Sequence, residues 1–320
     1  MAAVAAALPR ALSRLCPRRC SALPRPAWPG AHRGHRGDGG SGTAGRARWA
    51  RPGGAALAFL GGFALFPRDD QEDGEDAIVL LLKRAKMGNV AYMQGQLDNA
   101  EKLYKATMSY MLAGDTKEDD NAVLEVSLKL ASIYAAQKQH KLAVAGYQFC
   151  ILTLEEKIAK QKDLPEDVLS AEEKANTQLL LGMSLDSYGR YLLNINELPA
   201  AQKMYEKALQ ISNDVQGETH PQSVVLMNDL ATVLDAQGRY EEAHAYSRRA
   251  AELARATQHP EEHMVLNNLA AILMHKEDFL QAKQVYKEAL KQAQQKGDAA
   301  SVQHIQEELA ELAKRRKGSK

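Results

Sequence analysis

This chain has few of the residues that build disulfides, metal centres or base-stacking surfaces. Its 320 residues include only 3 cysteines, 5 phenylalanines and 2 tryptophans. Cys16 and Cys20 lie in a basic leader that we expect to be removed, so the mature chain has no pair with which to form an intrachain disulfide. Cys150 remains alone and is predicted to be a small buried residue. A disulfide scaffold and a zinc site built from cysteine pairs are thereby excluded.

The sequence also lacks convincing motifs for catalysis or cofactor binding. Residues 37–42 match the glycine spacing of a dinucleotide-binding turn, but no strand is expected before them and no amphipathic helix after them. His259 and His263 are four residues apart, a spacing that can bind a metal on a helix. Pro260 predicts instead that His259 precedes the helix. We therefore expect no cofactor, no metal and no small-molecule substrate, and we predict that the chain is not an enzyme.

Acidic residues and lysine are nearly missing from the first 68 residues, which contain eleven arginines, no lysine and one acid, Asp38. The residues beyond Arg68 carry 30 basic and 39 acidic side chains, a net charge of −9. An arginine-rich, acid-poor start is typical of a mitochondrial transit peptide, which we predict over residues 1–51. A disordered RNA-binding arm is the alternative. With only Trp28 and Trp49 to stack on bases, that arm is disfavoured, and we expect no nucleic-acid partner.

Residues 52–67 contain no charge and are predicted to be a short transmembrane or sorting segment. A transmembrane helix usually needs about 17 to 25 apolar residues, so this segment is short for a span. Arginines precede it, and residues 68–76 form an acidic linker after it. This asymmetry favours an inner mitochondrial membrane anchor with its basic end in the matrix and the rest of the chain in the intermembrane space. A matrix-facing orientation and an apolar patch in a disordered leader are the alternatives.

A repeated pattern of small residues dominates the remainder of the chain. Five times a glycine or alanine is followed twelve positions later by alanine, and seven positions further by another small residue. Two helices that cross closely need small side chains at the crossing, because larger ones would push the axes apart. The three sets, in that order, are Gly88, Ala131, Gly189, Ala231 and Ala270; Ala100, Ala143, Ala201, Ala243 and Ala282; and Thr107, Cys150, Ala208, Ala250 and Ala289.

This pattern predicts an all-α fold, a tetratricopeptide-repeat α-solenoid over residues 77–317, preceded by a disordered leader and the short membrane segment. Successive alanines lie 43, 58, 42 and 39 residues apart, more than the usual period of about 34. We expect the surplus to lengthen the helices. Pro165 should end one helix, and Ser170 with Glu173 should cap the next as a capping box. A helix from Ala299 is predicted to cap the last repeat.

The free side of the first helix in each hairpin is the usual place for partner contacts in such an array. Asn228 and Asn267 occupy equivalent positions and are expected to form an amide ladder for an extended peptide backbone. A solvated polar face without a partner is the alternative. The predicted partner-binding residues are Asp186 and Arg190 in the third repeat, Asn228, Thr232 and Asp235 in the fourth, and Asn267 and Met274 in the fifth.

Longer runs resemble one family in particular. The segments that begin at Leu97 (LDNAEKLYKATMSY), Leu128 (LKLASIYAAQ) and Leu234 (LDAQGR) are similar to the mitochondrial tetratricopeptide repeat protein 19 family. The resemblance covers about residues 77–317. It implies a non-catalytic inner-membrane factor that engages respiratory complex III and supports its assembly and maintenance. It also implies a role in clearing fragments left by processing of the Rieske iron-sulfur subunit.

One departure from that family is expected at the start of the array. The resemblance implies an additional hairpin after the helix that includes Ile78–Lys86, whereas here this segment runs directly into Met87 and Gly88. We predict that residues 77–94 form one continuous first helix. A cytosolic cargo adaptor similar to kinesin light chains is the alternative function, although such an adaptor predicts no transit peptide and usually a heptad segment, neither of which fits this chain.

Overall fold

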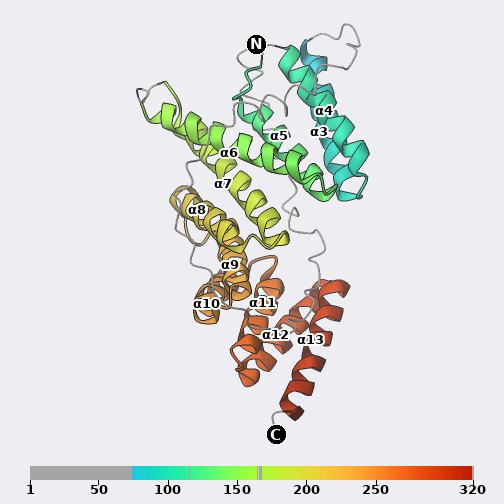
Figure 1. The fold of residues 1–320 in the computed structure, drawn as a ribbon, viewed down its shortest axis with the longest axis vertical. Coiled ribbons are helices and arrows are strands. Elements are labelled where there is room, and N and C mark those ends of the chain that lie inside the picture. Colours follow the sequence, from blue (N-terminus) through green and yellow to red (C-terminus); the bar gives the residue numbers. More distant parts are fainter. Residues whose placement is uncertain (1–73, 115, 164, 166–167, 319–320) are drawn as a thin grey trace, which may run out of the picture. The chain divides into compact units, whose positions relative to one another are not determined.

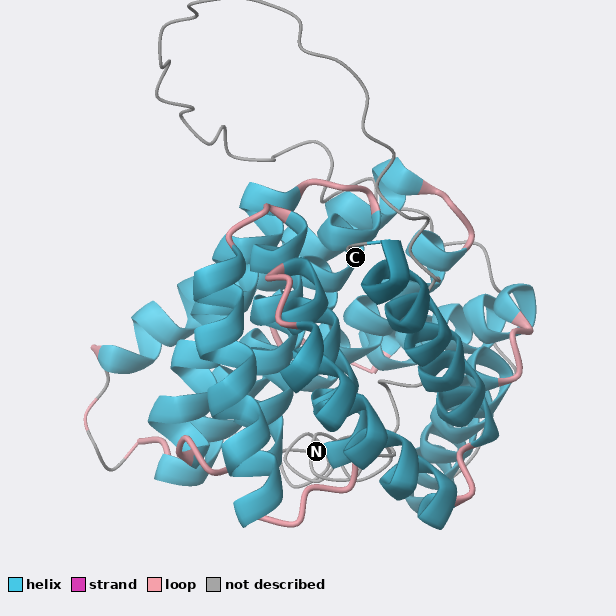
Figure 2. Ribbon diagram, turned by 90° about the horizontal axis from the view of Figure 1, so that it is seen from below, coloured by secondary structure: helices cyan, strands magenta, loops and turns pink. Residues whose placement is uncertain are grey.

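The protein is helical throughout the part that can be described (Figures 1 and 2). The structure is a computed structural model that describes residues 74–114, 116–163, 165 and 168–318. The predicted leader and membrane segment lie outside these residues, as do residues 37–42. Each hairpin pairs a first helix with a second helix. The first helices are α3 (Gly74–Met93), α5 (Asn121–Ala136), α7 (Ala171–Asn194), α9 (Pro221–Ala236) and α11 (Glu262–His275). The second helices are α4 (Leu97–Ala113), α6 (His140–Lys162), α8 (Leu198–Gln216), α10 (Tyr240–Ala256) and α12 (Phe279–Lys296), and α13 (Ala299–Gly318) follows.

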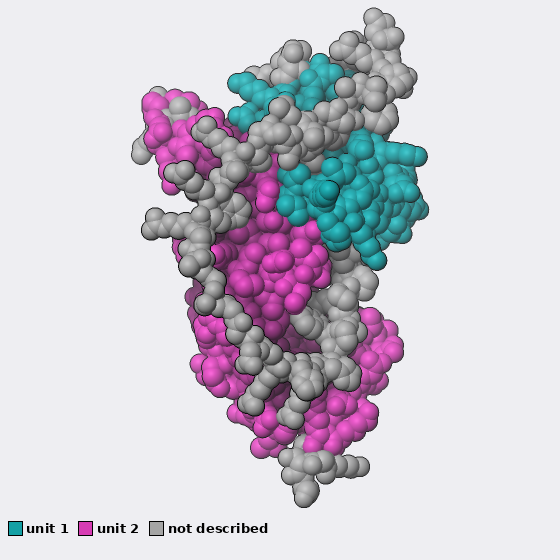
Figure 3. Space-filling model, in the orientation of Figure 1, with its two compact units in different colours: residues 1–146 teal, residues 147–320 magenta. Residues whose placement is uncertain are grey.

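The chain divides into two compact units, Met1–Gly146 and Tyr147–Lys320 (Figure 3). In the first unit, α4 packs against both α3 and α5. In the second unit, each helix from α7 to α12 packs against the helix that follows it, and α13 packs on both α12 and α11. The predicted all-α tetratricopeptide-repeat solenoid with a capping helix is confirmed. The continuous first helix predicted over residues 77–94 corresponds to α3, which ends at Met93.

Helix ends fall where the sequence predicts them. Helix α6 ends at Lys162, shortly before Pro165. Ser170 then caps α7: its Oγ accepts the backbone N–H of Glu173 at 3.2 Å, and Glu173 Oε2 accepts the backbone N–H of Ser170 at 3.1 Å. This is the predicted capping box. His259 precedes α11, as predicted, and its Nδ1 accepts the backbone N–H of Glu261 at 3.0 Å.

The hairpin crossings have the predicted register. All fifteen small residues at the crossings are buried. Tyr104 and Tyr205, on α4 and α8, fill the space left by the glycines opposite them. A Cβ added to Gly88 would lie 3.0 Å from the Tyr104 ring, and one added to Gly189 would lie 3.2 Å from the Tyr205 ring. Cys150 is fully buried, as predicted, and burial raises the pKa of its thiol well above the ordinary value.

Polar side chains at the ends of first helices connect neighbouring hairpins in a recurring way. The residue just after the first helix reaches back to the first turns of the preceding second helix. Gln137 Nε2 donates to Asp98 Oδ1 at 3.0 Å in the first unit. In the second unit, Gln237 Nε2 donates to Gln202 Oε1 at 3.0 Å, and Lys276 Nζ donates to Glu241 Oε2 at 2.8 Å. Successive hairpins are thus joined by polar contacts at their ends as well as by apolar packing.

The last helix closes the array. Ile305 and Leu312 of α13 are almost fully buried. Tyr286, on α12, donates its hydroxyl to Glu308 Oε2 at 3.3 Å. The predicted capping role of this helix is confirmed by its packing on α12 and α11. Within the described residues, no helix is both long and apolar enough to cross a membrane.

Two glycines of α7 should respond oppositely to alanine. Gly189→Ala should lower the free energy of unfolding by about 1 kcal/mol or more, because its Cβ would lie 3.2 Å from the Tyr205 ring and 3.3 Å from Met204 Cβ. Gly182→Ala places its Cβ at an ordinary 3.5 Å from Ile211 Cγ2. It should therefore raise stability by about 0.5–1 kcal/mol through helix propensity. Urea denaturation followed by circular dichroism measures both. Equal effects of the two substitutions would contradict the close crossing.

Candidate protein-binding face

The first helices of the second unit are joined by polar side chains that bond from one helix to the next. We call this set the first-helix network. It comprises Asp186 and Arg190 on α7, Asn228, Asp229, Thr232 and Asp235 on α9, and Asn268 and His275 on α11. Five of these residues were predicted as partner contacts from the repeat register, and two more predicted residues, Asn267 and Met274, lie on α11.

Arg190 links α7 to α9. Its guanidinium lies 3.2 Å from Asp186 Oδ1, one helical turn away, and 3.8 Å from Asp229 Oδ2 on the neighbouring first helix. The Arg190 guanidinium therefore interacts with two carboxylates, those of Asp186 and Asp229. Burial raises the pKa of Asp186 above its ordinary value, and the Asp229 carboxylate adds to that effect. The attraction of Asp186 raises the pKa of Arg190 further, so the arginine stays charged. This end of the network carries an excess of acidic groups.

Amide and hydroxyl groups link α9 to α11. Asn268 Nδ2 donates to Asn228 Oδ1 at 2.9 Å, and Thr232 Oγ1 lies 3.4 Å from the same amide nitrogen. Thr232 also donates its hydroxyl to the backbone carbonyl of Asn228 at 3.0 Å. Asn228 and Asn267 do not form the expected ladder, because Asn268 takes the place of Asn267 as the partner of Asn228. The Oδ1 atom of Asn267 is buried and has no hydrogen-bond partner in the structure.

An ion pair closes the network at the far end of α9. His275 Nδ1 lies 2.8 Å from both carboxylate oxygens of Asp235. The ring of His275 also packs on Tyr240, with 5.5 Å between centroids. The hydrogen bond to Asp235 raises the pKa of His275 above its ordinary value, although burial opposes it. Because His275 is at the exposed end of α11, this pair is the part of the network that solvent reaches most easily.

The predicted residues differ in how far they can be reached from outside. Asn228 and Met274 are only 3% and 5% exposed, so they do not face solvent as the repeat register suggests. The physical reason is packing between first helices: α11 packs against α9 as well as α10, and α13 packs over it. The other predicted residues, which are Asp186, Arg190, Thr232, Asp235 and Asn267, are partly exposed, and their role in partner binding stays a prediction.

Sequence reasoning missed three members of the network, Asp229, Asn268 and His275. Asp229 and Asn268 directly follow the predicted residues Asn228 and Asn267. The repeat register therefore identified the correct helical turns, but the predicted residues lie one position before these two members of the network. His275 ends α11, and its basic side chain in the last turn was the available signal. All three depend on partners on another first helix.

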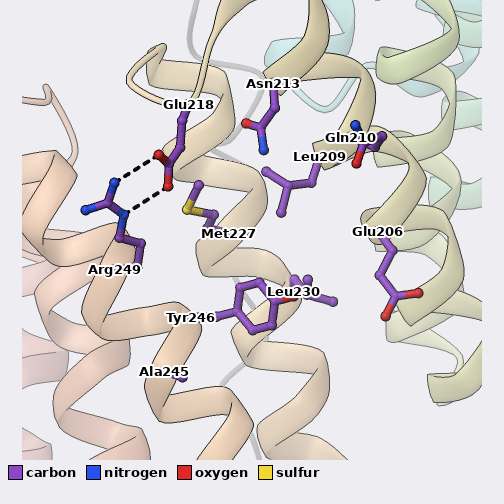
Figure 4. A pocket seen from close by; sticks show the side chains of 10 residues that line it. All are labelled: Glu206, Leu209, Gln210, Asn213, Glu218, Met227, Leu230, Ala245, Tyr246 and Arg249. Atoms are coloured by element: carbon purple, nitrogen blue, oxygen red, sulfur yellow. Dashed lines mark hydrogen bonds and ion pairs between the residues drawn. The ribbon is translucent and has the colours of Figure 1, made fainter.

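A separate hollow of about 520 Å³ lies over α8, α9 and α10 (Figure 4). Leu209, Met227 and Leu230 form its apolar floor, and Tyr246 projects into it. At its rim, Arg249 Nε and Nη2 each donate to a carboxylate oxygen of Glu218 at 2.9 Å. No nucleophile paired with a base lines this hollow. It is a packing groove between hairpins rather than a site with catalytic geometry.

The histidines considered as metal ligands take structural roles. His259 is buried: its Nδ1 accepts the backbone N–H of Glu261 just before α11, and its Nε2 lies 3.3 Å from the backbone carbonyl of Pro221. His263 Nε2 lies 3.2 Å from Asp298 Oδ2. Across the residues that the structure describes, no group of three or more histidine, cysteine, aspartate or glutamate side chains is placed to hold a metal ion. The chemistry of this surface is therefore that of hydrogen bonding and charge.

Comparison with known proteins gives one consistent set of relatives. The chain is 64% identical to human "Tetratricopeptide repeat protein 19, mitochondrial" over 229 residues, which cover 72% of this chain and 60% of the human protein. It is 61% identical to the mouse protein of the same name, covering 72% of this chain and 62% of that one. The zebrafish protein is 53% identical over 186 residues, covering 58% and 46%. The chain thus spans about three fifths of the length of its mammalian relatives.

Models of the tetratricopeptide repeat match residues 180–256 and 265–296. Among solved structures, BtubC (BKLC) from P. vanneervenii is 15% identical with a TM-score of 0.57, covering 69% of this chain and 83% of that chain. Aspartyl phosphate phosphatase F from Bacillus subtilis is 14% identical with a TM-score of 0.54, covering 78% and 63%. At these identities the likeness concerns the fold alone.

The ion pair between His275 and Asp235 predicts a pH-dependent contribution to stability. The folded pKa of His275 is raised above the unfolded value of about 6.5, so its contribution is complete below pH about 6.5 and is lost as pH rises through the folded pKa. The stability difference between the natural chain and His275→Gln should be larger at pH 5.5 than at pH 8. Because His275 is exposed, that difference should stay below about 1 kcal/mol. Thermal unfolding at both pH values, with Asp235→Asn for comparison, measures it, and an equal difference at both would contradict the pair.

Proposed function

Because this chain belongs to the family of mitochondrial tetratricopeptide repeat protein 19, we propose that it is a non-catalytic factor of the inner mitochondrial membrane that supports assembly and maintenance of respiratory complex III. The family resemblance implies complex III as the partner. The fold contributes tetratricopeptide repeats, a type of repeat that binds proteins, and a candidate contact face. The arginine-rich start of the chain and the mitochondrial relatives support a mitochondrial localisation.

The first-helix network is the observation that carries the binding part of this proposal. Three carboxylates, on Asp186, Asp229 and Asp235, share one arginine and one histidine along neighbouring helices. A segment that supplies lysine, arginine or backbone N–H groups would complement the acidic character of this set. Because these side chains are held in place by bonds between helices, little conformational entropy is lost when a partner binds. The site therefore suits an extended, partly basic segment of a complex III subunit, including fragments of the Rieske iron-sulfur protein.

The proposal includes a topology, with the repeats in the intermembrane space. The charge asymmetry around residues 52–67 supports it, since arginines precede this segment and acids follow it. The acidic linker would also hold the array away from anionic lipid.

Protease treatment of mitochondria tests this topology. With a tag at the carboxyl end, the repeats should be protected in intact mitochondria and degraded once the outer membrane is ruptured. A matrix protein measured in the same samples controls for inner-membrane integrity. Survival of the tagged repeats in ruptured mitochondria would place them in the matrix.

The complex III partnership predicts comigration on a native gel. The tagged full chain, in detergent-solubilised mitochondria, should run with complex III. The double variant Asp235→Asn with His275→Gln should weaken comigration, because it removes the exposed ion pair of the network while keeping groups that can hydrogen-bond. Quantified blots for the tag and for a complex III subunit give the measurement.

A matched control is available on the second helices. Arg255 Nη2 and Glu288 Oε2 form an exposed ion pair of 2.9 Å between α10 and α12. The variant Arg255→Gln with Glu288→Gln should comigrate like the natural chain. Loss of comigration in both variants would indicate a general defect in the array. A cytosolic location of the natural chain would instead revive the cargo-adaptor alternative.

A further inference from the structure

The first helix of the array leaves apolar side chains open to solvent. On α3, Met87, Val90 and Met93 are 58%, 51% and 62% exposed. They are three residues apart and lie on one side of the helix. The other side, with Leu81, Ala85 and Gly88, is buried, and α3 packs on α4. We call the exposed side, which also carries the exposed cations Lys83 and Lys86, the open face of α3.

Three later first helices bury the same positions, and in α7 the corresponding residues are Tyr188, which is half-buried, and Tyr191, which is buried. Met87 precedes the small crossing residue Gly88 by one place, and Val90 follows it by two. The residues at these two places in α5, α9 and α11 are between 0% and 5% exposed. They are Leu130, Leu230 and Leu269 at the first place, and Ile133, Val233 and Ile272 at the second. The exposure of Met87 and Val90 is therefore specific to α3 and is not a property of the position.

The structure also indicates what kind of element covers these positions. The second helix of the preceding hairpin packs on each of these first helices: α4 on α5, α8 on α9 and α10 on α11. Each of these second helices buries a pair of apolar or small residues three positions apart, just after its small crossing residue. The pairs are Met108 and Met111, Leu209 and Ser212, and Ala251 and Ala254. The element that fits such a face is an amphipathic helix.

The charges on the open face indicate which kind of amphipathic helix would bind there. Lys83 and Lys86 lie on the open face, one turn before Met87 and Val90, and no acidic residue lies between Lys83 and Met93. Two copies of this chain that paired through α3 would place four lysines, and no carboxylate from residues 83–93, in one interface, since a two-fold interface uses the same surface twice. Like charges so placed oppose association, whereas glutamate or aspartate beside the apolar stripe of a partner helix favours it.

We propose that the open face of α3 is a docking site for an acidic amphipathic helix of another protein. The helix lies on α3 as the second helix of a preceding hairpin lies on α5, α9 or α11. Its apolar residues cover Met87 and Val90, and its carboxylates pair with Lys83 and Lys86. This surface is separate from the first-helix network, so the chain can hold two partners or two segments of one partner.

A binding assay with designed peptides tests this site. The probe is a fluorescent helical peptide of about 20 residues, with leucine at every third or fourth position and glutamate on the flanks. Its match has lysine in place of glutamate. In anisotropy titrations of the full chain, the glutamate peptide should bind, and the lysine peptide should bind about tenfold or more weakly. Amide hydrogen exchange should slow within α3 when the glutamate peptide is bound.

Variants of the chain locate the binding. Met87→Ser with Val90→Ser should weaken binding of the glutamate peptide about tenfold or more, because both side chains lose apolar contact. Since both residues are exposed, circular dichroism should show unchanged unfolding. Leu280→Ser, which alters a 65% exposed leucine on α12, is the matched control and should leave binding unchanged.

Three results would overturn the proposal. They are absence of binding by the glutamate peptide, equal binding of the two peptides, and unchanged binding by the Met87 and Val90 variant. Sedimentation equilibrium tests whether a second copy of this chain occupies the open face instead. A dimer of the natural chain that disappears in the same variant would assign the face to a second copy and refute the partner-helix proposal.

Discussion

The close crossing of two helices within each hairpin is the constraint on which the rest of this structure depends. Gly88 and Gly189 lie directly against the rings of Tyr104 and Tyr205, so the space that a Cβ would take is already filled by an aromatic ring. Alanine takes the glycine's place in the other hairpins and is equally buried. Because protein interiors are close-packed, the small residue determines how near the helices lie and therefore where the far side of the second helix is presented.

That far side is what makes the repeats stack. In the second unit, α8 packs on α9 and α10 on α11, so each second helix belongs to two layers of the core. The polar contacts of Gln237 and Lys276 to the preceding second helices then link the ends of the hairpins. A hairpin stabilised in this way depends on its neighbours, since its own crossing buries only one side of each helix. Among the described residues no second helix precedes α3, and one side of α3 is exposed.

More of the fold than of the binding face could be predicted from the sequence. Crossing residues, the capping box at Ser170 and the end of α6 near Pro165 all follow from local spacing, which the chain itself carries. The first-helix network depends on how far each hairpin is turned relative to the next. Asn228 meets Asn268, and Asp235 meets His275, across 40 residues in each case. The alanine spacing varies between 42 and 39 in this region, so counting positions could not decide which amide faces Asn228. Met274 is buried for another reason, the packing of α9, α10 and α13 against α11.

The network also shows how stacking and recognition compete for the same side chains. Asn228 and Asp229 lie on the first helices, where an extended ligand would be expected, yet they are buried and engaged with neighbouring helices. Their bonds fix the relative positions of α7, α9 and α11 at the expense of direct contact with a partner. Recognition on that side is left to the partly exposed groups, chiefly Asp235 with His275 and the flank of Arg190. Among the described residues there is no such competition on α3, because no hairpin in that part of the chain precedes α3 and engages Met87 or Val90. The two surfaces therefore differ in kind: one is charged and already ordered by its neighbours, and the other is apolar and open.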